Sequence, residues 1–410
     1  MLGIEVEATC SPQVERKVVA ASTEGRSYCV AGTLLGELAE LDIPAKRCER
    51  ITQRIGRERI IERDARLEQY EQLPLPEQRQ APPDAPDPCW KSRVAAVLID
   101  GGRAQIRDER WGQPHPPEET VSWWKEPKVA CLATFSSPLP TSDPQAEVPD
   151  CLLDPLWVIP RVKEIKRGRG GETSECQACS SRAAREQPQE EPPRWSPEPL
   201  VRSVVATFQS YETLGRLAKV EAYHRGFMGA ARKAFLGDGH LSNWAIHQRH
   251  FSHYTPITDL LHALSYVYHA ALESTPDMAS CWERCERWIR WVWQGEVRRV
   301  ISELKPLVES AQERSRETLQ ESLTYLKNNA SRMRYDQYRQ IGLPITTTLI
   351  ESTIKQINRR MKGTEKFWHP GAEPQLQLCA DRISETDPLA TFWKKRPARQ
   401  TGFRKSRTTT

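Results

Sequence analysis

The chain lacks long apolar runs. No uninterrupted hydrophobic stretch in its 410 residues approaches the roughly 20 residues that a membrane-spanning helix needs. The first residues also lack the apolar core of a secretory signal peptide. Hydrophobic residues make up 38% of the chain, and there are 31 prolines. We therefore expect a cytoplasmic protein with substantial loops and no membrane partner.

A strong net charge is also missing. The 59 basic and 54 acidic residues leave a net charge of only +5, so any affinity for a polyanion must be local. Two basic runs stand out, Lys163 to Arg169 and Lys394 to Arg407, and the second holds seven basic and no acidic residues. Such runs suit phosphate contacts, although they are also common in solvated tails.

Cysteine pairs with the spacing of a zinc site are scarce. Among 11 scattered cysteines, the close pairs are Cys176 with Cys179 and Cys281 with Cys285. A four-ligand zinc site needs a second ligand pair, and none of usual spacing lies near Cys176. The histidines at positions 240, 247, 250 and 253 share no helical face. We predict reduced thiols and no zinc site.

The segment from Tyr338 to Trp368 is the most informative part of the chain. After Gly342 and Pro344 break a helix, apolar residues recur at helical spacing at Ile350, Ile354, Ile357 and Met361. The hydroxyls of Thr346 to Thr348 are suitable N-caps. Glu351 therefore lies in the first turn of a predicted helix.

A polar stripe runs beside this apolar one. Counting four, seven and eleven residues on from Glu351 gives Lys355, Asn358 and Lys362. For this helix alone, a solvated face with one Glu–Lys pair is the better explanation of the pattern.

Two short apolar runs each end at an aspartate followed by glycine. Val94 to Ile99 has the length of a strand and stops at Asp100, and Ala231 to Leu236 leads to Asp238. A carboxylate that follows a buried strand points out at the sheet edge, where a metal or substrate can reach it. Each aspartate alone is also an ordinary turn residue.

The predicted elements follow one another as three strands, helix, strand, helix, strand and then further helices. The strands are expected at Val94 to Ile99, Ala104 to Ile106, Lys128 to Phe135, Ala231 to Leu236 and His253 to Thr258, with the first helix at Val201 to Tyr223. This order matches the ribonuclease-H-like arrangement. We predict an α/β fold with a ribonuclease-H-like mixed sheet, an all-helical insertion and a helical N-terminal region.

The same patterns divide the chain into regions. We expect a helical N-terminal region at 1–88, core parts at 89–135, 201–262 and 342–393, a loop-rich insertion at 136–200, a helical insertion at 263–341 and a basic tail at 394–410.

Three carboxylates at such positions suit phosphodiester chemistry. Cleavage and strand transfer need an activated oxygen nucleophile and a stabilised leaving oxygen, and two Mg²⁺ ions serve both needs. Mg²⁺ prefers carboxylate oxygens and keeps positions open for water and phosphate. Asp100, Asp238 and Glu351 each sit at a predicted strand end or helix start.

The sequence resembles the DDE transposases of bacterial insertion sequences, specifically the ISKra-type group related to the Mutator-like superfamily. Three blocks in order carry the resemblance: LIDGGRAQIR, then ARKAFLGDGHLSNWAIHQRHFSHYTPITDLLHA, then RMRYDQYRQIGLPITTTLIESTIKQINRRMKGTEKFW with GAEPQLQL. The match spans about residues 26 to 393. Departures are Thr346 to Thr348, where relatives often have small residues, and a shorter N-terminal region, from which we expect part of the end-recognition domain to have been lost.

The resemblance implies a metal-dependent enzyme that binds terminal inverted repeats, nicks the element ends and joins the 3′ hydroxyls to target DNA. Asp100, Asp238 and Glu351 would hold two Mg²⁺ ions, with Mn²⁺ able to substitute, and Asp259 and His262 would be accessory residues. Expected DNA contacts are Lys355, Asn358, Arg359, Lys362, Lys394, Lys395, Arg396, Arg404 and Lys405. A homo-oligomer acting on DNA, associated with the nucleoid, is also implied.

Two other functions remain open from the sequence. The chain could be a catalytically inactive DNA-binding remnant of such an element, or a helical scaffold that binds nucleic acid.

Overall fold

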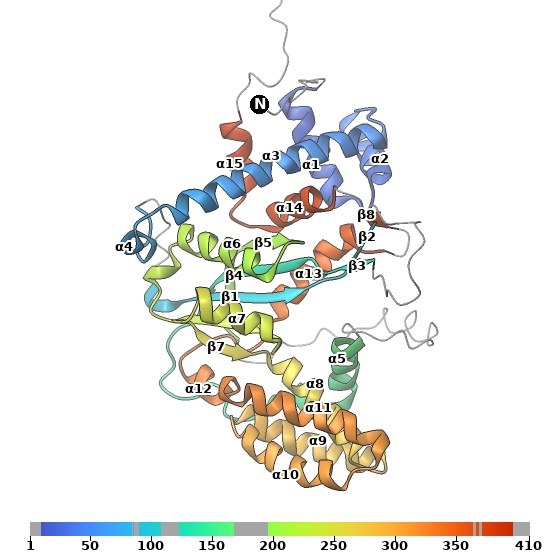
Figure 1. Cartoon of the computed structure of the whole chain (residues 1–410), viewed down its shortest axis with the longest axis vertical. Coiled ribbons are helices and arrows are strands. Elements are labelled where there is room, and N and C mark those ends of the chain that lie inside the picture. The colour runs from blue at the N-terminus through green and yellow to red at the C-terminus, as the bar shows by residue number, and fades with distance from the viewer. Residues whose placement is uncertain are drawn as a thin grey trace, which may run out of the picture.

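The computed structural model of the chain describes residues 10–83, 85, 90–107, 123–167, 196–363, 366–368 and 371–396. Its centre is a five-stranded mixed sheet with the order β5-β4-β1-β6-β7 (Figure 1). The strands are β1 (Arg93–Gly101), β4 (Lys128–Ser136), β5 (Glu198–Thr207), β6 (Lys233–Gly237) and β7 (Thr255–Thr258). β1, β4 and β5 pair antiparallel, whereas β6 is parallel to both of its neighbours, β1 and β7.

β1 is buried on both faces. All residues from Val94 to Ile99 are 0% exposed. Successive side chains of a strand point to opposite faces, and accordingly Val94, Ala96 and Leu98 join one hydrophobic cluster while Ala95, Val97 and Ile99 join another. The strand therefore anchors both layers of the protein.

Helices cover both faces of the sheet (Figure 1). α6 (Tyr211–His224) and α7 (Leu241–His250) contribute Leu214, Ala218 and Ile246 to the cluster on one face. The other face is covered by α8 (Leu260–Glu273) and α13 (Thr348–Met361), whose residues share the larger cluster with Leu98.

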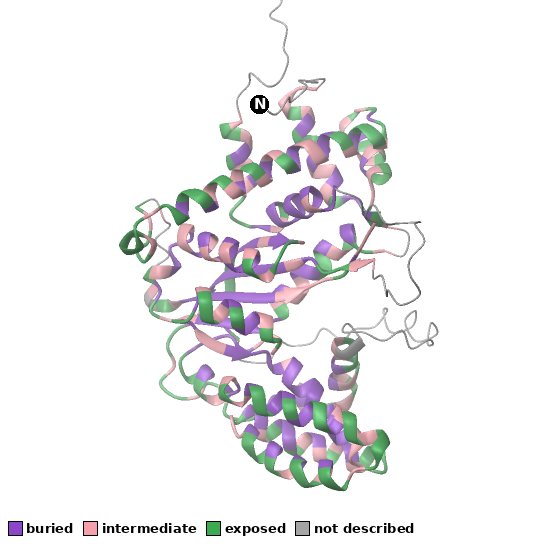
Figure 2. Ribbon diagram, viewed as in Figure 1, coloured by how far each residue is buried: buried purple, intermediate pink, exposed green. Residues whose placement is uncertain are grey.

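α8 continues into a helical region that lies beside the sheet. It consists of α9 (Met278–Trp293), α10 (Val297–Ser310), α11 (Glu313–Asn329) and α12 (Tyr335–Gln340). The predicted helical character of this region is confirmed. Figure 2 shows the exposed residues of α9 to α11 on the outside of the bundle and the buried ones within it. Trp288 and Trp293 are among the buried residues, so they serve the core and are not available to stack on bases.

The N-terminal helices pack onto the C-terminal ones. α1 (Pro12–Glu24), α2 (Tyr28–Ala39) and α3 (Ala45–Glu71) share a hydrophobic cluster with Leu378 of α14 (Ala372–Ile383) and Phe392 of α15 (Pro388–Lys395). The short α4 (Leu75–Gln78) follows α3. A buried ion pair of 2.8 Å between Arg59 and Asp381 adds to this contact.

The prediction that Ala104 to Ile106 joins the main sheet is wrong. β2 (Ala104–Ile106) pairs with β3 (Trp124–Lys125) and β8 (Phe367–Trp368) in a separate three-stranded sheet. The physical reason is that β1 has no free edge, because β4 occupies one edge and β6 the other.

The prediction of a helix from Val201 is also wrong. Residues Glu198–Thr207 form β5, and the helix begins only at Tyr211. β4 is paired with β1 on one edge, so its backbone N–H and C=O groups on the other edge need partners, and β5 supplies them.

The stretch expected to be a loop-rich insertion contains a helix, α5 (Pro155–Arg167). Val158 and Val162, one helical turn apart, are both 1% exposed, and α5 packs against α8. No helix in the described parts of the chain is long and apolar enough to cross a membrane.

Candidate active site

Asp100 and Asp238 lie side by side at one edge of the sheet. Ile99 and Gly237 are paired across the parallel strands β1 and β6, and each aspartate is the next residue in its chain. Because side chains alternate along a strand, Asp100 faces the same side as Leu98, toward the layer formed by α8 and α13. Asp238 follows the end of β6, and its Oδ1 accepts hydrogen bonds from the backbone N–H of His240 and the amide of Asn243 at the start of α7.

Glu351 reaches this edge from α13. The predicted apolar stripe is confirmed, because Ile350, Ile354, Ile357 and Met361 are all buried. Glu351 lies in the first turn, as predicted, but the threonine hydroxyls do not cap the helix. The hydroxyl of Thr347 instead lies 3.4 Å from Oε1 of Glu351, within hydrogen-bond distance.

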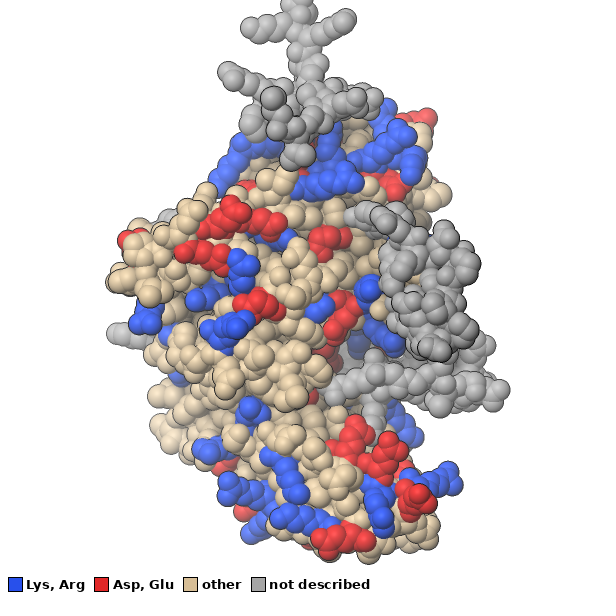
Figure 3. Space-filling model, in the orientation of Figure 1, with Lys and Arg blue, Asp and Glu red and all other residues tan. Residues whose placement is uncertain are grey.

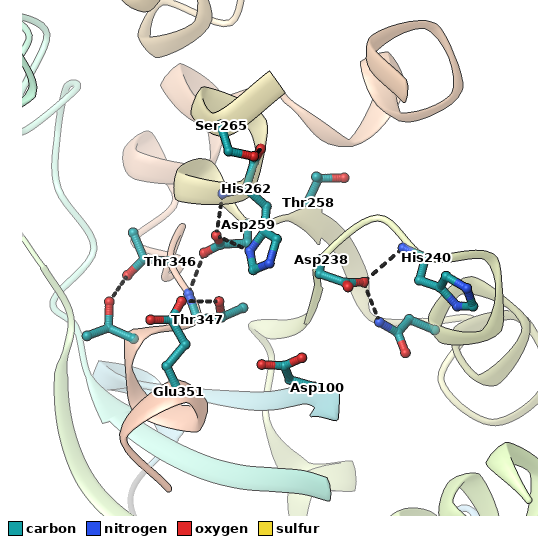
Figure 4. Close-up of polar contacts among 12 residues, drawn as sticks. Asp100, Asp238, His240, Thr258, Asp259, His262, Ser265, Thr346, Thr347 and Glu351 are labelled. Carbon is teal, nitrogen blue, oxygen red and sulfur yellow. Dashed lines mark hydrogen bonds and ion pairs between the residues drawn. The ribbon is translucent and has the colours of Figure 1, made fainter. Parts of the chain in front are cut away.

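The predicted carboxylates line one cleft of about 1330 Å³. Asp100, Asp238, Glu351 and His262 all line it. Figure 4 shows Asp100, Asp238 and Glu351 coming from three separate parts of the chain, with Asp259 and His262 above them at the start of α8. Acids separated by more than a hundred positions in the chain thus border a single space.

Asp259 fixes the geometry of the cleft. It is 0% exposed. Oδ1 accepts the backbone N–H of Thr347 at 2.6 Å, and Oδ2 accepts the backbone N–H and lies 2.9 Å from Nδ1 of His262. Its own N–H donates to the carbonyl of Gly237. One residue thereby joins β6, α8 and the start of α13.

The pKa values reflect crowded negative charge. Burial raises the pKa of Asp100 to about 7, and the neighbouring Asp238 and Glu351 add to the rise, whereas His262 and the N–H of Gly101 oppose it. Burial also raises the pKa of Glu351, with Asp259 adding to the effect. Carboxyl groups with raised pKa values in a cleft are typical of functional sites.

His262 carries the compensating positive charge. Burial alone would lower its pKa, but the hydrogen bond and charge of Asp259, together with Asp238 and Asp100, raise the pKa to about 9. The ring is therefore an imidazolium at neutral pH. It is held facing the acids by Asp259.

The side chains that lie close enough together to hold one metal ion differ from the predicted set of Asp100, Asp238 and Glu351. Within the described residues, Asp259, His262 and Glu351 have ligand atoms within 4.8 Å of one another. Both oxygens of Asp259 and Nδ1 of His262 are already hydrogen-bonded, and a protonated imidazole is a poor ligand. Asp100 and Asp238 border the same cleft without belonging to that close group.

The cysteine pairs show no metal site in the described residues. Cys281 and Cys285 are buried free thiols, and Cys176 and Cys179 lie outside the residues that the structure describes.

Among the predicted DNA contacts on α13, Lys355, Asn358 and Lys362 line the cleft. Lys355 lies 3.6 Å from Glu164 of α5 across the cleft, with both side chains mostly exposed. Arg359 is exposed but is not part of the cleft lining. Figure 3 shows basic and acidic side chains interspersed over the visible face, so the described part of that face is not dominated by one sign.

The basic tail is only partly described. Lys394 and Lys395 are exposed at the end of α15, whereas Arg404 and Lys405 lie outside the described residues. The prediction for Arg396 needs correction, because its side chain is 6% exposed and pairs with Glu15 and Glu58. These acids occupy its guanidinium, so it is part of the packing between the two ends of the chain.

Sequence reasoning missed one wall of the cleft. Tyr211, Glu126, His240 and Asn243 all line it. In the sequence, His240 stands out only as one of four histidines that could bind zinc. The signal that could have identified it is its position two residues after Asp238. A residue so close to an aspartate at the end of a strand is expected to border the same binding site.

No protein-family model and no curated protein matches this chain.

Proposed function

We propose that the protein is a DDE-type transposase of an insertion sequence, a metal-dependent DNA nuclease and strand transferase that acts on the ends of its element. The observation that carries the proposal is the pairing of Ile99 with Gly237. It brings Asp100 and Asp238 to one sheet edge, where they border the same cleft as Glu351.

The order of the sheet supports a ribonuclease-H-like core for this chemistry. In chain order the five strands are an antiparallel meander of β1, β4 and β5, followed by β6 and β7 parallel to β1. A helix separates β5 from β6 and another separates β6 from β7. This is the order of elements that the resemblance implies, although some of the strands are not those predicted.

The donor chemistry of the cleft fits Mg²⁺. Asp100, Asp238 and Glu351 offer only carboxylate oxygens, which are the ligands that Mg²⁺ prefers. Burial raises the pKa values of Asp100 and Glu351, with Asp238 and Glu351 adding to the rise at Asp100 and Asp259 adding to it at Glu351. Bound ions, two in the proposed mechanism, would activate a water or a 3′ hydroxyl and stabilise the leaving oxygen.

The basic residues of the cleft would contact the DNA or offset the charge of the acids. Lys355 and Lys362 border the cleft and would neutralise phosphates of the entering strand. His262, fixed by Asp259, offsets part of the negative charge when no cation is bound. A homo-oligomer that holds two element ends together is part of the proposal.

The test uses purified protein, Mg²⁺ and a DNA duplex that carries the inverted repeats bracketing the gene. The parent protein should cut at the repeat ends. The variants Asp100→Asn, Asp238→Asn and Glu351→Gln should lose cleavage while they still bind the duplex, because they lose metal ligands and keep the basic residues.

Glu164→Gln is the matched control, since Glu164 is an acid of the same cleft on the opposite wall. It should cut like the parent. Equal cleavage by the three site variants and the parent would refute the assignment of the acids. Binding without any metal-dependent cleavage would favour the inactive remnant.

A further inference from the structure

His240 lies at the exposed start of α7, directly beside Asp238. Its backbone N–H donates to Oδ1 of Asp238 at 2.9 Å. The side chain is exposed, and both residues line the cleft. The carboxylate of Asp238 and the side chain of His240 therefore border the same space.

The ring is fixed by two further contacts. Nδ1 accepts the backbone N–H of Ser242 at 3.3 Å and so caps α7. One face of the imidazole stacks on Tyr211, with ring centroids 6.3 Å apart and an interplanar angle of 28°. An exposed side chain that is already ordered loses little conformational entropy when it binds a ligand.

Tyr211 is itself held in place. Its hydroxyl donates to Glu126 at 3.0 Å, and the ammonium of Lys128 lies 5.1 Å from the centre of its ring. These contacts support the ring on which His240 stacks.

The hydrogen-bond pattern determines which ring nitrogen carries the proton. Because Nδ1 accepts from Ser242, the hydrogen is on Nε2. Among the described residues, Nε2 has no hydrogen-bond partner. An ordered N–H donor thus remains unused in a cleft with lysines at its edge.

The capping role alone does not explain this residue. Helix N-caps are usually Ser, Thr, Asn or Asp, and any of these would cap α7 without a ring. A second polar residue borders the same space and helps to hold Asp238. Asn243 is 3% exposed and lines the cleft, its amide donates to Asp238, and its Oδ1 has no partner.

We propose that His240 is a substrate-contacting residue whose Nε2–H donates to an oxygen of the phosphodiester group cleaved at the site. The inference rests on the proposed function and extends it to a residue outside the three acids. No bond to the ring forms or breaks, because its role is to bind charge that develops on phosphate oxygen.

The test compares two amides that mimic different ring nitrogens. In His240→Asn, the amide oxygen replaces Nδ1 and keeps the cap, but the Nε2–H is lost. In His240→Gln, the amide nitrogen reaches the position of Nε2, but the cap is lost. His253→Asn is the matched control, because His253 is an exposed histidine outside the cleft lining.

We expect His240→Asn to melt like the parent with and without Mg²⁺, while kcat for cleavage falls about 100- to 1,000-fold, the order found when one preorganised donor is removed. His240→Gln should melt lower and cut faster than His240→Asn. A purely structural role predicts the opposite order of cleavage and overturns the inference.

The outcomes separate this inference from the proposed function. An active parent with an equally active His240→Asn refutes the role of His240 alone. Should the parent not cut, affinity for the same duplex in Ca²⁺ decides. Weaker binding by His240→Asn than by His240→Gln supports the contact, and equal binding overturns it. A parent that neither cuts nor binds DNA overturns both proposals.

Discussion

The backbone N–H of Thr347 donates a 2.6 Å hydrogen bond to Oδ1 of Asp259 and so joins the start of α13 to the start of α8. The second oxygen of Asp259 holds His262. The position of Glu351, four residues after Thr347, depends on this carboxylate.

Removing that carboxylate should destabilise the protein. Asp259→Ala leaves the N–H of Thr347 and the buried ring of His262 without their partner, so the free energy of unfolding should fall by about 3 kcal/mol. Urea denaturation measures the change. Asp277→Ala removes the equivalent N-cap of α9, which is exposed, and should cost clearly less. Equal losses would show that Asp259 is an ordinary cap.

Asp100→Asn should stabilise the protein in the absence of divalent ions. The pKa of Asp100 is about 7 in the folded chain, against an ordinary value of 3.8. As the pH rises between these values the unfolded chain loses the proton first, so the folded state of the parent loses stability, and the loss is complete above about pH 7. Asparagine has no such dependence.

The advantage of Asp100→Asn over the parent should therefore be larger by at least about 1 kcal/mol at about pH 8 than at about pH 5. Thermal or urea unfolding in EDTA measures it. A difference that does not change with pH would mean that Asp100 is not held in a charge-crowded site.

The ring of His262 should titrate near pH 9, because Asp259, Asp238 and Asp100 raise its pKa to about 9 against the effect of burial. NMR of the histidine side chains follows each ring separately. His253 is an internal control in the same spectrum, since partial burial of its ring and the nearby Lys233 lower its pKa below 6.5. A His262 ring that is neutral at pH 7 would contradict the claim that His262 offsets the negative charge of the acids.

Arg396 and Lys395 should behave differently when replaced by alanine. Arg396→Ala leaves Glu15 and Glu58 without one of their cations, so it should lower stability by about 2 kcal/mol and leave the salt dependence of DNA binding unchanged. Lys395→Ala should leave stability unchanged and flatten the salt dependence, because one fewer counterion is released. Fluorescence anisotropy at several salt concentrations measures both slopes. A flattened slope for Arg396→Ala alone would contradict the burial of its side chain.

The elements at the site could be predicted where the pattern is local. The apolar spacing of α13 and the apolar runs that lead to Asp100 and Asp238 can be recognised from residues that are close together in the sequence. β5, the separate sheet of β2 and the helix α5 could not be predicted, because each depends on which edge or face another element leaves free. The wall formed by Tyr211 and His240 likewise depends on contacts between residues that are not neighbours in the chain.

The hydrogen bonds of Asp259 illustrate the same limit. Its place beside His262 was inferred from resemblance alone. Nothing in the sequence indicates that its other oxygen binds Thr347, 88 positions away, because that contact exists only once α8 and α13 pack on the same face of the sheet.

The most direct test of the central claim is the anomalous difference density of Mn²⁺ in crystals of the protein with bound DNA. The account predicts peaks within bonding distance of the carboxylates of Asp100, Asp238 and Glu351, with the ring of His262 unligated. A peak ligated by Asp259 and His262, or none at the three acids, would contradict it.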